Sequence, residues 1–190
     1  MKQIIILNAP PGAGKDTIGG LVKDYSPVPL RMLSFKKPMF EIAHSILGDY
    51  YFGLFMAAYD NRDEKEKPMP ILNGLSPRQF MIWISETVIK PQFGDQYFGR
   101  RFVEEARRDI MTPVICTDGG FPSEVKPLIS AGFKVDVCRL HRDGYTFEGD
   151  SRDYLNLGDY HYRYKEHDFL LVSGDPMHTV NEIITKFLAK

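Results

Sequence analysis

Residues with clear chemistry stand near the start of the chain, where the apolar run 4–7 leads into the glycine-rich segment 9–17, APPGAGKDT. The order of apolar strand, glycine-rich turn and helix-forming sequence is typical of a loop that binds phosphate. Gly12 and Gly14 let the backbone approach phosphate oxygens, the amides at the start of the following helix point toward the anion, and Lys15 supplies a positive charge. We therefore expect this segment to bind the phosphates of a nucleotide.

Two positions of this segment depart from the common pattern. Ala9 stands in place of the leading glycine, and Asp16 stands where a serine or threonine hydroxyl usually binds magnesium. The alternative interpretation is a tight turn between a strand and a helix, in which the lysine is incidental. Because the strand, the spacing and the Gly-Lys pair coincide, we favour the phosphate-binding loop.

Charged residues later in the chain stand where further parts of a phosphate site are expected. Asp118 follows the apolar run 112–117, and an acid at the end of a central strand can hold Mg²⁺ directly or through water. Its alternative role is to cap the helix that follows. Lys36 and Lys37 come just after a second apolar run, at the edge of a parallel sheet where ligands bind. Arg78 stands in the first turn of a helix, where a cation is unfavourable unless an anion binds it.

The composition restricts the class of protein. A chain of 190 residues of which 43% are hydrophobic can bury one core, or one core and a small lid. The net charge of −1 argues against nonspecific binding to a nucleic acid polymer. No apolar stretch approaches the ~20 residues that would span a membrane, and the chain enters a strand too early for a signal peptide. Cys116 and Cys138 lie in apolar runs, as expected for buried thiols in a reducing compartment, so we expect a cytoplasmic protein with no membrane partner.

The elements that must position these residues alternate between strand and helix. Apolar, β-branched segments recur at 3–8, 30–34, 112–117, 132–140 and 168–172, with helix-forming sequence between them. This alternation predicts an α/β fold in which a mostly parallel five-stranded sheet is flanked by helices in three layers.

Three helices are well marked. Ser76 precedes Pro77 and Gln79 in the pattern of a capped helix start, and Asp175 precedes Pro176 in a similar way. Apolar residues at helical spacing predict buried faces in the helix after Ser76, in a helix near 98–110 and in the last helix. These residues are Phe80, Trp83, Ile84 and Thr87, then Phe98, Phe102, Ala106 and Ile110, and finally Val180, Ile183, Ile184, Phe187 and Leu188.

Two regions interrupt this pattern. Residues 49–75 are aromatic, then charged, then rich in proline and glycine, and residues 141–167 carry arginines and histidines among acids and tyrosines. Long polar insertions in a compact α/β domain often form lids or substrate loops, and a disordered surface loop is the alternative for 141–167. Arg139, Arg142 and Arg152 follow the core of the fourth predicted strand, where a lid would bring them to a transferred phosphoryl group. These arginines favour the lid.

The chain resembles the bacteriophage-type deoxynucleoside monophosphate kinases, a branch of the P-loop nucleoside monophosphate kinases. The resemblance rests on the segments 14–17 (GKDT), 34–38 (SFKKP), 76–79 (SPRQ), 118–124 (DGGFPSE) and 150–152 (DSR). It implies one domain of the three-layer P-loop NTPase fold, residues 1–190, with an acceptor-binding insertion at about 35–100 and a lid at about 141–167. The implied reaction transfers the γ-phosphoryl group of ATP, bound with Mg²⁺, to a deoxynucleoside monophosphate, in the host cytoplasm for a phage protein.

The resemblance and the residue patterns together assign roles to individual side chains. We expect the catalytic residues to be Lys15, Arg142 and Arg152. We expect ATP to be bound by Gly12, Ala13, Gly14, Lys15, Asp16, Thr17, Arg139, Gly174 and Asp175. We expect the acceptor to be bound by Phe35, Lys36, Lys37, Arg78 and Asp150, and Mg²⁺ by Asp16 and Asp118.

Several features leave alternatives open. Phosphomevalonate kinases of the animal type share the GKD signature, so Asp16 alone does not select a nucleotide acceptor. Members of the resembled family often carry an arginine within the segment that here is 118–121, and this chain lacks it. The alternatives are a P-loop kinase of a non-nucleotide phosphorylated metabolite and a non-catalytic nucleotide-binding accessory protein. The aromatic run 50–55 fits a homodimer interface as well as a core, and the residues that compete to stack on an acceptor base are Phe35, Tyr50, Tyr51 and Trp83.

Overall fold

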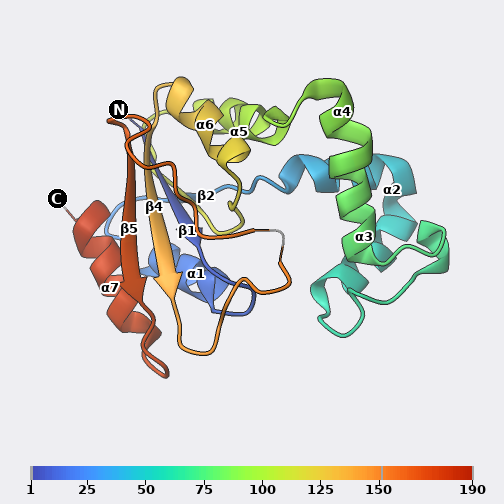
Figure 1. The fold of residues 1–190 in the computed structure, drawn as a ribbon, viewed down its shortest axis with the longest axis horizontal. Helices are drawn as coiled ribbons and strands as arrows, with labels where there is room; N and C mark the ends of the chain where they lie inside the picture. The colour runs from blue at the N-terminus through green and yellow to red at the C-terminus, as the bar shows by residue number, and fades with distance from the viewer. Residues whose placement is uncertain (1, 151, 190) are drawn as a thin grey trace. The chain divides into compact units, whose positions relative to one another are not determined.

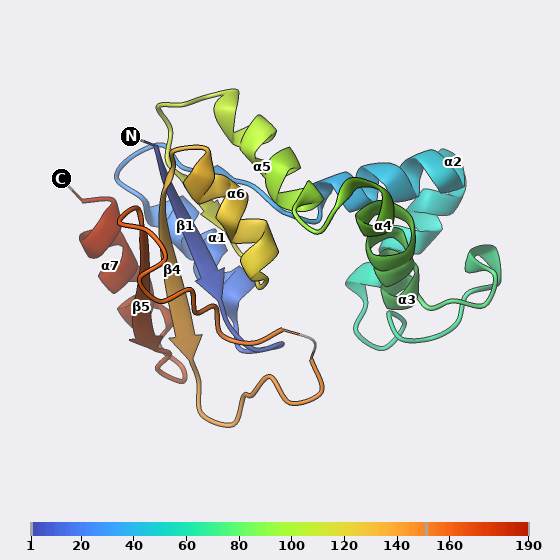
Figure 2. The ribbon, with the colours of Figure 1, turned by 45° about the horizontal axis from the view of Figure 1, so that its top comes forward.

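The computed structural model describes residues 2–150 and 152–189, which form two compact units. The sheet unit consists of the described part of residues 1–35 and 99–190, and the helical unit consists of residues 36–98. Figures 1 and 2 show the elements of both units. The helical unit comprises nearly the residues that we expected of an acceptor-binding insertion, and its role in binding stays a prediction.

A five-stranded parallel sheet forms the centre of the sheet unit, in the order β2-β3-β1-β4-β5. Its strands are β1 (Gln3–Asn8), β2 (Arg31–Met32), β3 (Val114–Cys116), β4 (Lys134–His141) and β5 (Tyr164–Leu170). Ile4 of β1 pairs with Val114 on one side and with Val135 on the other, so β1 is central. Because all pairings are parallel, the carboxyl ends of the strands meet at one edge of the sheet.

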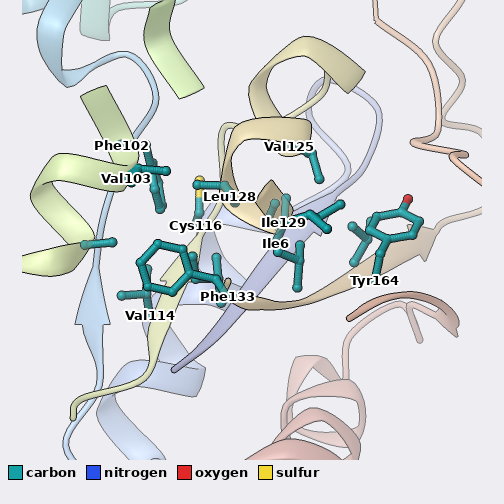
Figure 3. Close-up of a cluster of buried hydrophobic side chains, with 14 of the residues drawn as sticks. Ile6, Phe102, Val103, Val114, Cys116, Val125, Leu128, Ile129, Phe133 and Tyr164 are labelled. Atoms are coloured by element: carbon teal, nitrogen blue, oxygen red, sulfur yellow. The ribbon is translucent and has the colours of Figure 1, made fainter. Parts of the chain in front are cut away.

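Helices cover both faces of this sheet because residues of the central strand alternate between two apolar cores. The helices α1 (Lys15–Tyr25) and α7 (Pro176–Phe187) pack on the face that carries Ile5 and Leu7. The helices α5 (Tyr97–Arg107) and α6 (Pro122–Ser130) pack on the opposite face, with Ile4 and Ile6. Figure 3 shows side chains from β1, β3, α5 and α6 meeting in this second core. The predicted three-layer α/β fold is confirmed.

The helical unit has an apolar core of its own. It consists of α2 (Lys37–Asp60), the 3₁₀ turn η1 (Pro70–Leu72), α3 (Pro77–Ile82), the π-helical segment η2 (Trp83–Ile89) and α4 (Lys90–Phe93). α2 is kinked at Gly48, whose φ of 69° and ψ of 169° interrupt the helical backbone. The buried residues of the core are Ala43, Phe55, Leu72, Phe80, Met81, Ile84, Ile89 and Phe98. These residues all belong to the helical unit, so its core is formed from its own side chains.

Two predicted helix starts are confirmed by their caps. The Ser76 hydroxyl accepts a hydrogen bond from the Gln79 backbone N–H at 3.2 Å, and the Gln79 Oε1 accepts one from the Ser76 N–H at 2.8 Å. This reciprocal pair is a capping box and fixes the start of α3. The Asp175 carboxylate accepts a hydrogen bond from the His178 N–H at 3.2 Å and caps α7.

Three predicted boundaries are wrong. α5 ends at Arg107, so Ile110 lies outside the helix and is 63% exposed rather than buried. β5 begins at Tyr164 rather than at 168, because it is an edge strand whose residues 165–168 are polar and carry little apolar signal. Residues 50–60, assigned to an irregular region, continue α2.

The π-helical segment η2 changes which residues face the core of the helical unit. Its Lys90 N–H bonds to the Ser85 carbonyl, five residues back, so the buried face shifts by about one residue. Ile84 and Ile89 are buried, whereas Thr87 is exposed and Trp83 is 38% exposed with its ring stacked on Phe80. The prediction of a regular face through Trp83 and Thr87 was therefore wrong.

Cys116 and Cys138 are buried free thiols, as predicted. Burial raises the pKa of both thiols, so neither is suited to act as a nucleophile at neutral pH. Within the part of the chain that the structure describes, no helix combines the length and the apolar character needed to cross a bilayer.

Candidate functional site

The glycine-rich loop follows β1 at the carboxyl edge of the sheet and leads directly into α1. Gly12 and Gly14 have φ angles of 76° and 106°, a left-handed backbone that disfavours other residues at these positions. The Ala13 N–H donates to the Pro10 carbonyl at 3.3 Å, which closes the turn. Gly14 is the N-cap of α1 and has no side chain to occupy the amides of the first helical turn. Because these amides carry the positive end of the helix dipole, the loop has the local structure of an anion site.

A cavity of about 210 Å³ lies beside this loop, within the sheet unit. Its walls come from the loop and the start of α1, from Arg142, and from the connection between β5 and α7. The lining residues are Ala13, Gly14, Thr17, Ile18, Arg142, Leu171, Val172, Gly174 and Pro176. The lining thus combines the polar side chains of Thr17 and Arg142 with apolar ones, a composition that suits a nucleotide with its phosphates at the loop.

Arg142 is the predicted lid arginine that the structure brings to the loop. Its guanidinium Nη1 donates to the Ala13 carbonyl at 3.2 Å, and the guanidinium lies 4.8 Å from the centroid of the Tyr145 ring. Gly14 faces the same nitrogen, because a Cβ at that position would lie 3.8 Å from it. Lys15, Asp16 and Arg142 therefore lie on the loop or in contact with it, as expected.

Arg139 is not brought to this cavity. Its Nε and Nη2 donate to the two carboxylate oxygens of Asp168 at 2.9 and 2.6 Å, and its Nη1 donates to Glu166 at 3.0 Å. The hydrogen bond to Asp168 raises the pKa of Arg139. Arg139 therefore joins β4 to the edge strand β5 and is not among the residues that line the cavity, so its contact with ATP stays a prediction. Asp175 likewise serves as the cap of α7, whereas Gly174 lines the cavity.

Arg152 and Asp150 form a bidentate pair beyond β4. The Arg152 Nε and Nη2 donate to Asp150 at 2.8 and 2.7 Å, and this hydrogen bonding raises the pKa of Arg152. The aliphatic part of Arg152 packs on Gly120, where a Cβ would lie 2.7 Å from the Arg152 Cδ. A side chain at 120 would thus displace Arg152. The structure therefore brings the predicted pair together, partly buried, with Arg152 packed against the loop that follows β3.

Asp118 accepts several hydrogen bonds at the carboxyl edge of the sheet. Its carboxylate accepts from the Ser34 hydroxyl, from the Phe35 N–H at 3.0 Å and from the Cys116 thiol at 3.0 Å. These bonds join the end of β3 to the segment that follows β2. The capping role that we held as the alternative for Asp118 belongs to Glu124, whose carboxylate accepts from the backbone N–H groups of Gly120 and Phe121.

The donor set for Mg²⁺ is small. No three His, Cys, Asp or Glu side chains group as a metal site within residues 2–150 and 152–189. Mg²⁺ in phosphoryl-transfer enzymes commonly has one or two carboxylates, with water and substrate phosphates as its other ligands. Asp16 is exposed in the first turn of α1 and fits this requirement. Asp118 fits an indirect role, through water, because both of its oxygens already accept hydrogen bonds.

Phe35 is not available to stack on a bound base. Its side chain is fully buried and stacks on Phe102, with ring centroids 4.4 Å apart. Its assignment to acceptor binding is therefore corrected to core packing in the sheet unit. Of the other aromatic candidates, Tyr50 and Tyr51 are 75% and 48% exposed, whereas Phe55 of the same run is buried in the core of the helical unit.

The predicted acceptor-binding cations lie in the helical unit, on two of its elements. Lys36 is the N-cap of α2. Lys37 lies in the first turn of that helix, with its Nζ 3.8 Å from the Glu41 Oε1. The Arg78 Nε lies 2.5 Å from Glu66, and the Arg78 backbone N–H donates to the Lys65 carbonyl at 3.2 Å. The start of α3 is thereby joined to the turn at 61–67.

Sequence reasoning missed two residues near these sites. Lys65 is half-buried, with its ammonium 3.6 Å from the centroid of the Tyr59 ring. Asn8 is 2% exposed at the end of β1, and its Oδ1 accepts from the Leu155 N–H at 2.7 Å. Lys65 lies in a charged run, DEKEK, that has the pattern of a solvated turn, and a single Asn before a glycine-rich loop carries no motif. Only the folded contacts identify them.

The chain is similar to several solved structures, although no protein-family model and no curated protein sequence matches it. One is the tunicamycin resistance protein of Deinococcus radiodurans, with 13% identity and a TM-score of 0.47 over 98% of this chain and 95% of that one. Another is a sugar kinase from a Janibacter species, with 12% identity and a TM-score of 0.45 over 97% and 93% of the two chains. A third is a gluconokinase from Sinorhizobium meliloti, with 10% identity and a TM-score of 0.41 over 98% and 93%. Likenesses this distant carry no weight for the activity of this chain.

Proposed function

We propose that the protein is a P-loop kinase that transfers the γ-phosphoryl group of ATP to a phosphorylated small molecule, and that this acceptor is a deoxynucleoside monophosphate. The kinase proposal is carried by the cavity at the start of α1, where the glycine-rich loop, Thr17 and Arg142 surround one space. The acceptor proposal rests on the sequence segments of the resembled family and on the cations Lys36 and Arg78.

The proposed donor site uses the loop for the phosphates of ATP and the apolar part of the cavity for its base. Lys15 and the first amides of α1 bind the β- and γ-phosphates and stabilise the charge that develops on the transferred group. Arg142, in contact with the Ala13 carbonyl, adds a second positive charge beside the loop. Ile18, Leu171 and Pro176 provide the apolar wall for the base.

The proposed reaction is a direct in-line transfer. A terminal oxygen of the acceptor phosphate forms a bond to the γ-phosphorus of ATP, the bond from that phosphorus to the β,γ-bridging oxygen breaks, and ADP leaves with the electron pair. The acceptor leaves as a diphosphate. No general base is required, because a phosphate monoester is already ionised at neutral pH. The protein's contribution is therefore positioning and charge.

Magnesium, when bound, neutralises charge on the phosphates of ATP. Asp16 would hold it directly, and Asp118 would act on it through water. The cations of this chain, Lys15 and Arg142, carry the remaining charge stabilisation in the proposed mechanism.

The kinase proposal is tested with Lys15→Ala. We expect transfer to fall by about 10²-fold or more, the typical effect of removing one group that stabilises a transition state, with the thermal unfolding midpoint unchanged. The matched control is Lys23→Ala, in the last turn of the same helix, which should keep its activity. Near-native turnover by Lys15→Ala would contradict the mechanism.

The acceptor proposal is tested by a screen with radiolabelled ATP against the four deoxynucleoside monophosphates and a set of phosphorylated metabolites. We expect transfer to at least one deoxynucleoside monophosphate. Transfer only to a non-nucleotide metabolite would assign the alternative kinase. Binding of ATP by calorimetry, without transfer to any acceptor, would instead favour a non-catalytic accessory protein.

A further inference from the structure

We propose that Lys65 and Arg78 form a phosphate-binding site in the helical unit, and that Lys65 binds the phosphate of the acceptor. The second part of this inference rests on the proposed function, whereas the anion site itself does not. It assigns a residue that no sequence motif identifies, and it specifies the ligand chemistry as a phosphate monoester.

The backbone of the helical unit holds Lys65 next to the start of α3. The Arg78 N–H donates to the Lys65 carbonyl at 3.2 Å, so the turn at 61–67 is fixed against the first turn of α3. The adjacent Glu66 carboxylate accepts from the Arg78 Nε at 2.5 Å, which makes a second link between turn and helix. Lys65 and Arg78 are therefore neighbours through the fold and not through a chance surface contact.

The Lys65 side chain is directed by an aromatic ring. Its ammonium lies 3.6 Å from the centroid of the Tyr59 ring, at the end of α2. A cation over a tyrosine face is attracted to it, and the ring limits the number of positions that the long side chain can adopt. A lysine side chain that is already held in one position loses less conformational entropy when it binds an anion than a lysine side chain that moves freely.

Both burial and neighbouring groups act on the charge of Lys65. Burial lowers the pKa of its ammonium, contact with Tyr59 raises it, and the charges of Lys36 and Arg78 lower it further. Within residues 2–150 and 152–189, no carboxylate lies within ion-pair distance of Lys65, whereas its neighbour Lys67 pairs with Glu64 at 2.8 Å. A dianionic phosphate bound between Lys65 and Arg78 would be attracted by both charges.

Glu66 sets a condition on binding. Its carboxylate occupies Arg78 in this structure, with half of each side chain exposed to solvent. An exposed ion pair of this kind contributes little to stability, so a phosphate can displace Glu66 from Arg78 at low cost. Lys65, which has no carboxylate within ion-pair distance among the described residues, then provides the first contact with the incoming anion.

A structural role for Lys65 is the alternative, in which its methylene chain simply packs on Tyr59. Lys65→Met separates the two roles, because methionine keeps an apolar side chain of similar length and removes the charge. Lys65→Arg restores the charge, and Lys67→Met removes a lysine two residues away that is already paired with an acid.

The test measures binding of each deoxynucleoside monophosphate to the full-length protein by calorimetry, with the phosphate loop filled by a non-hydrolysable ATP analogue and Mg²⁺. We expect Lys65→Met to weaken acceptor binding about tenfold or more, the usual effect of losing a charged hydrogen bond, and to leave binding of the ATP analogue unchanged. Lys65→Arg should recover most of the affinity, and Lys67→Met should bind within about twofold of the wild type. Equal acceptor binding by Lys65→Met and the wild type would overturn the inference.

A second readout separates the anion site from the proposed function. In protein labelled with ¹³C at the lysine ε carbons and filled with the ATP analogue, the Lys65 signal, assigned by its loss in Lys65→Arg, should shift on addition of inorganic phosphate. The Lys67 signal should not. If the wild type binds no deoxynucleoside monophosphate but Lys65 shifts with phosphate, the acceptor proposal fails and the anion site stands. An unmoved Lys65 signal refutes the anion site, whatever the acceptor is.

Discussion

Replacement of Asn8 by alanine should destabilise the sheet unit and loosen the segment that follows β4. The Asn8 side chain lies directly before the glycine-rich loop, is 2% exposed, and accepts the Leu155 N–H at 2.7 Å. Alanine would leave that N–H without its acceptor in the interior, where an unpaired polar group costs about 1–3 kcal/mol. For a chain of this size, a loss of about 2 kcal/mol lowers the unfolding midpoint by about 4–8 °C.

The same replacement should affect turnover, because the segment that Asn8 holds also carries the Asp150–Arg152 pair. The assays are thermal unfolding, phosphoryl transfer, and hydrogen exchange at the Leu155 amide, which should become faster by a factor that matches the lost free energy. Asn156→Ala is the matched control, because Asn156 is an exposed asparagine of the same segment whose side chain accepts a local hydrogen bond from the Gly158 N–H. If Asn8→Ala matched this control in stability, or left the Leu155 amide fully protected, the positioning role of Asn8 would be refuted.

Two further predictions concern contacts within the sheet unit. Gly120→Ala places a Cβ 2.7 Å from the Arg152 Cδ, so we expect lower turnover in a transfer assay with unchanged ATP affinity. Gly53→Ala, in open space, should be neutral or slightly stabilising, and equal turnover in both variants would contradict the role of Gly120. Hydrogen bonds from Arg139 lower the pKa of Asp168, so its stabilising contribution is complete above the unfolded-state pKa and is lost as the pH falls through the lower folded-state value. Because Asp168 is half-exposed, its contribution to the free energy of unfolding is well under 1 kcal/mol. In urea unfolding at several pH values, Asp168→Asn should reduce the loss of stability at acid pH by that amount. An unchanged dependence of stability on pH would refute the contribution of the pair.

The sequence was informative where local patterns determine local structure. The glycine-rich loop, the capping box at Ser76 and the Asp175 cap each depend on a few adjacent residues, and each was found where the pattern indicated. The parallel sheet was also predictable, because strands that are covered on both faces have continuous apolar sequences, such as residues 4–7.

The sequence was least informative where long-range pairing determines a residue's role. Arg139 has the charge expected of an ATP ligand, but the edge strand β5 places two carboxylates opposite it. Phe35 stands in the correct segment for an acceptor contact, but the packing of α5 buries its ring against Phe102. The face of η2 was misassigned because the inserted π turn has no sequence signal that a 3.6-residue period would detect.

Asp118 and Asn8 have a different role from the cations proposed to bind phosphate, because each joins two segments that are distant in the chain. Asp118 holds Ser34 and Phe35, which end one part of the sheet unit, and Lys36 is the next residue. Asn8 holds Leu155, five residues after Asp150. Each of these hydrogen-bonded side chains, the half-buried Asp118 and the buried Asn8, therefore fixes the end of a segment whose neighbouring residues are candidates for phosphate contact. Because a side chain held by hydrogen bonds has few alternative positions, the carboxyl edge of the sheet can hold its connections in place before any ligand binds, which is the condition for catalysis by positioning.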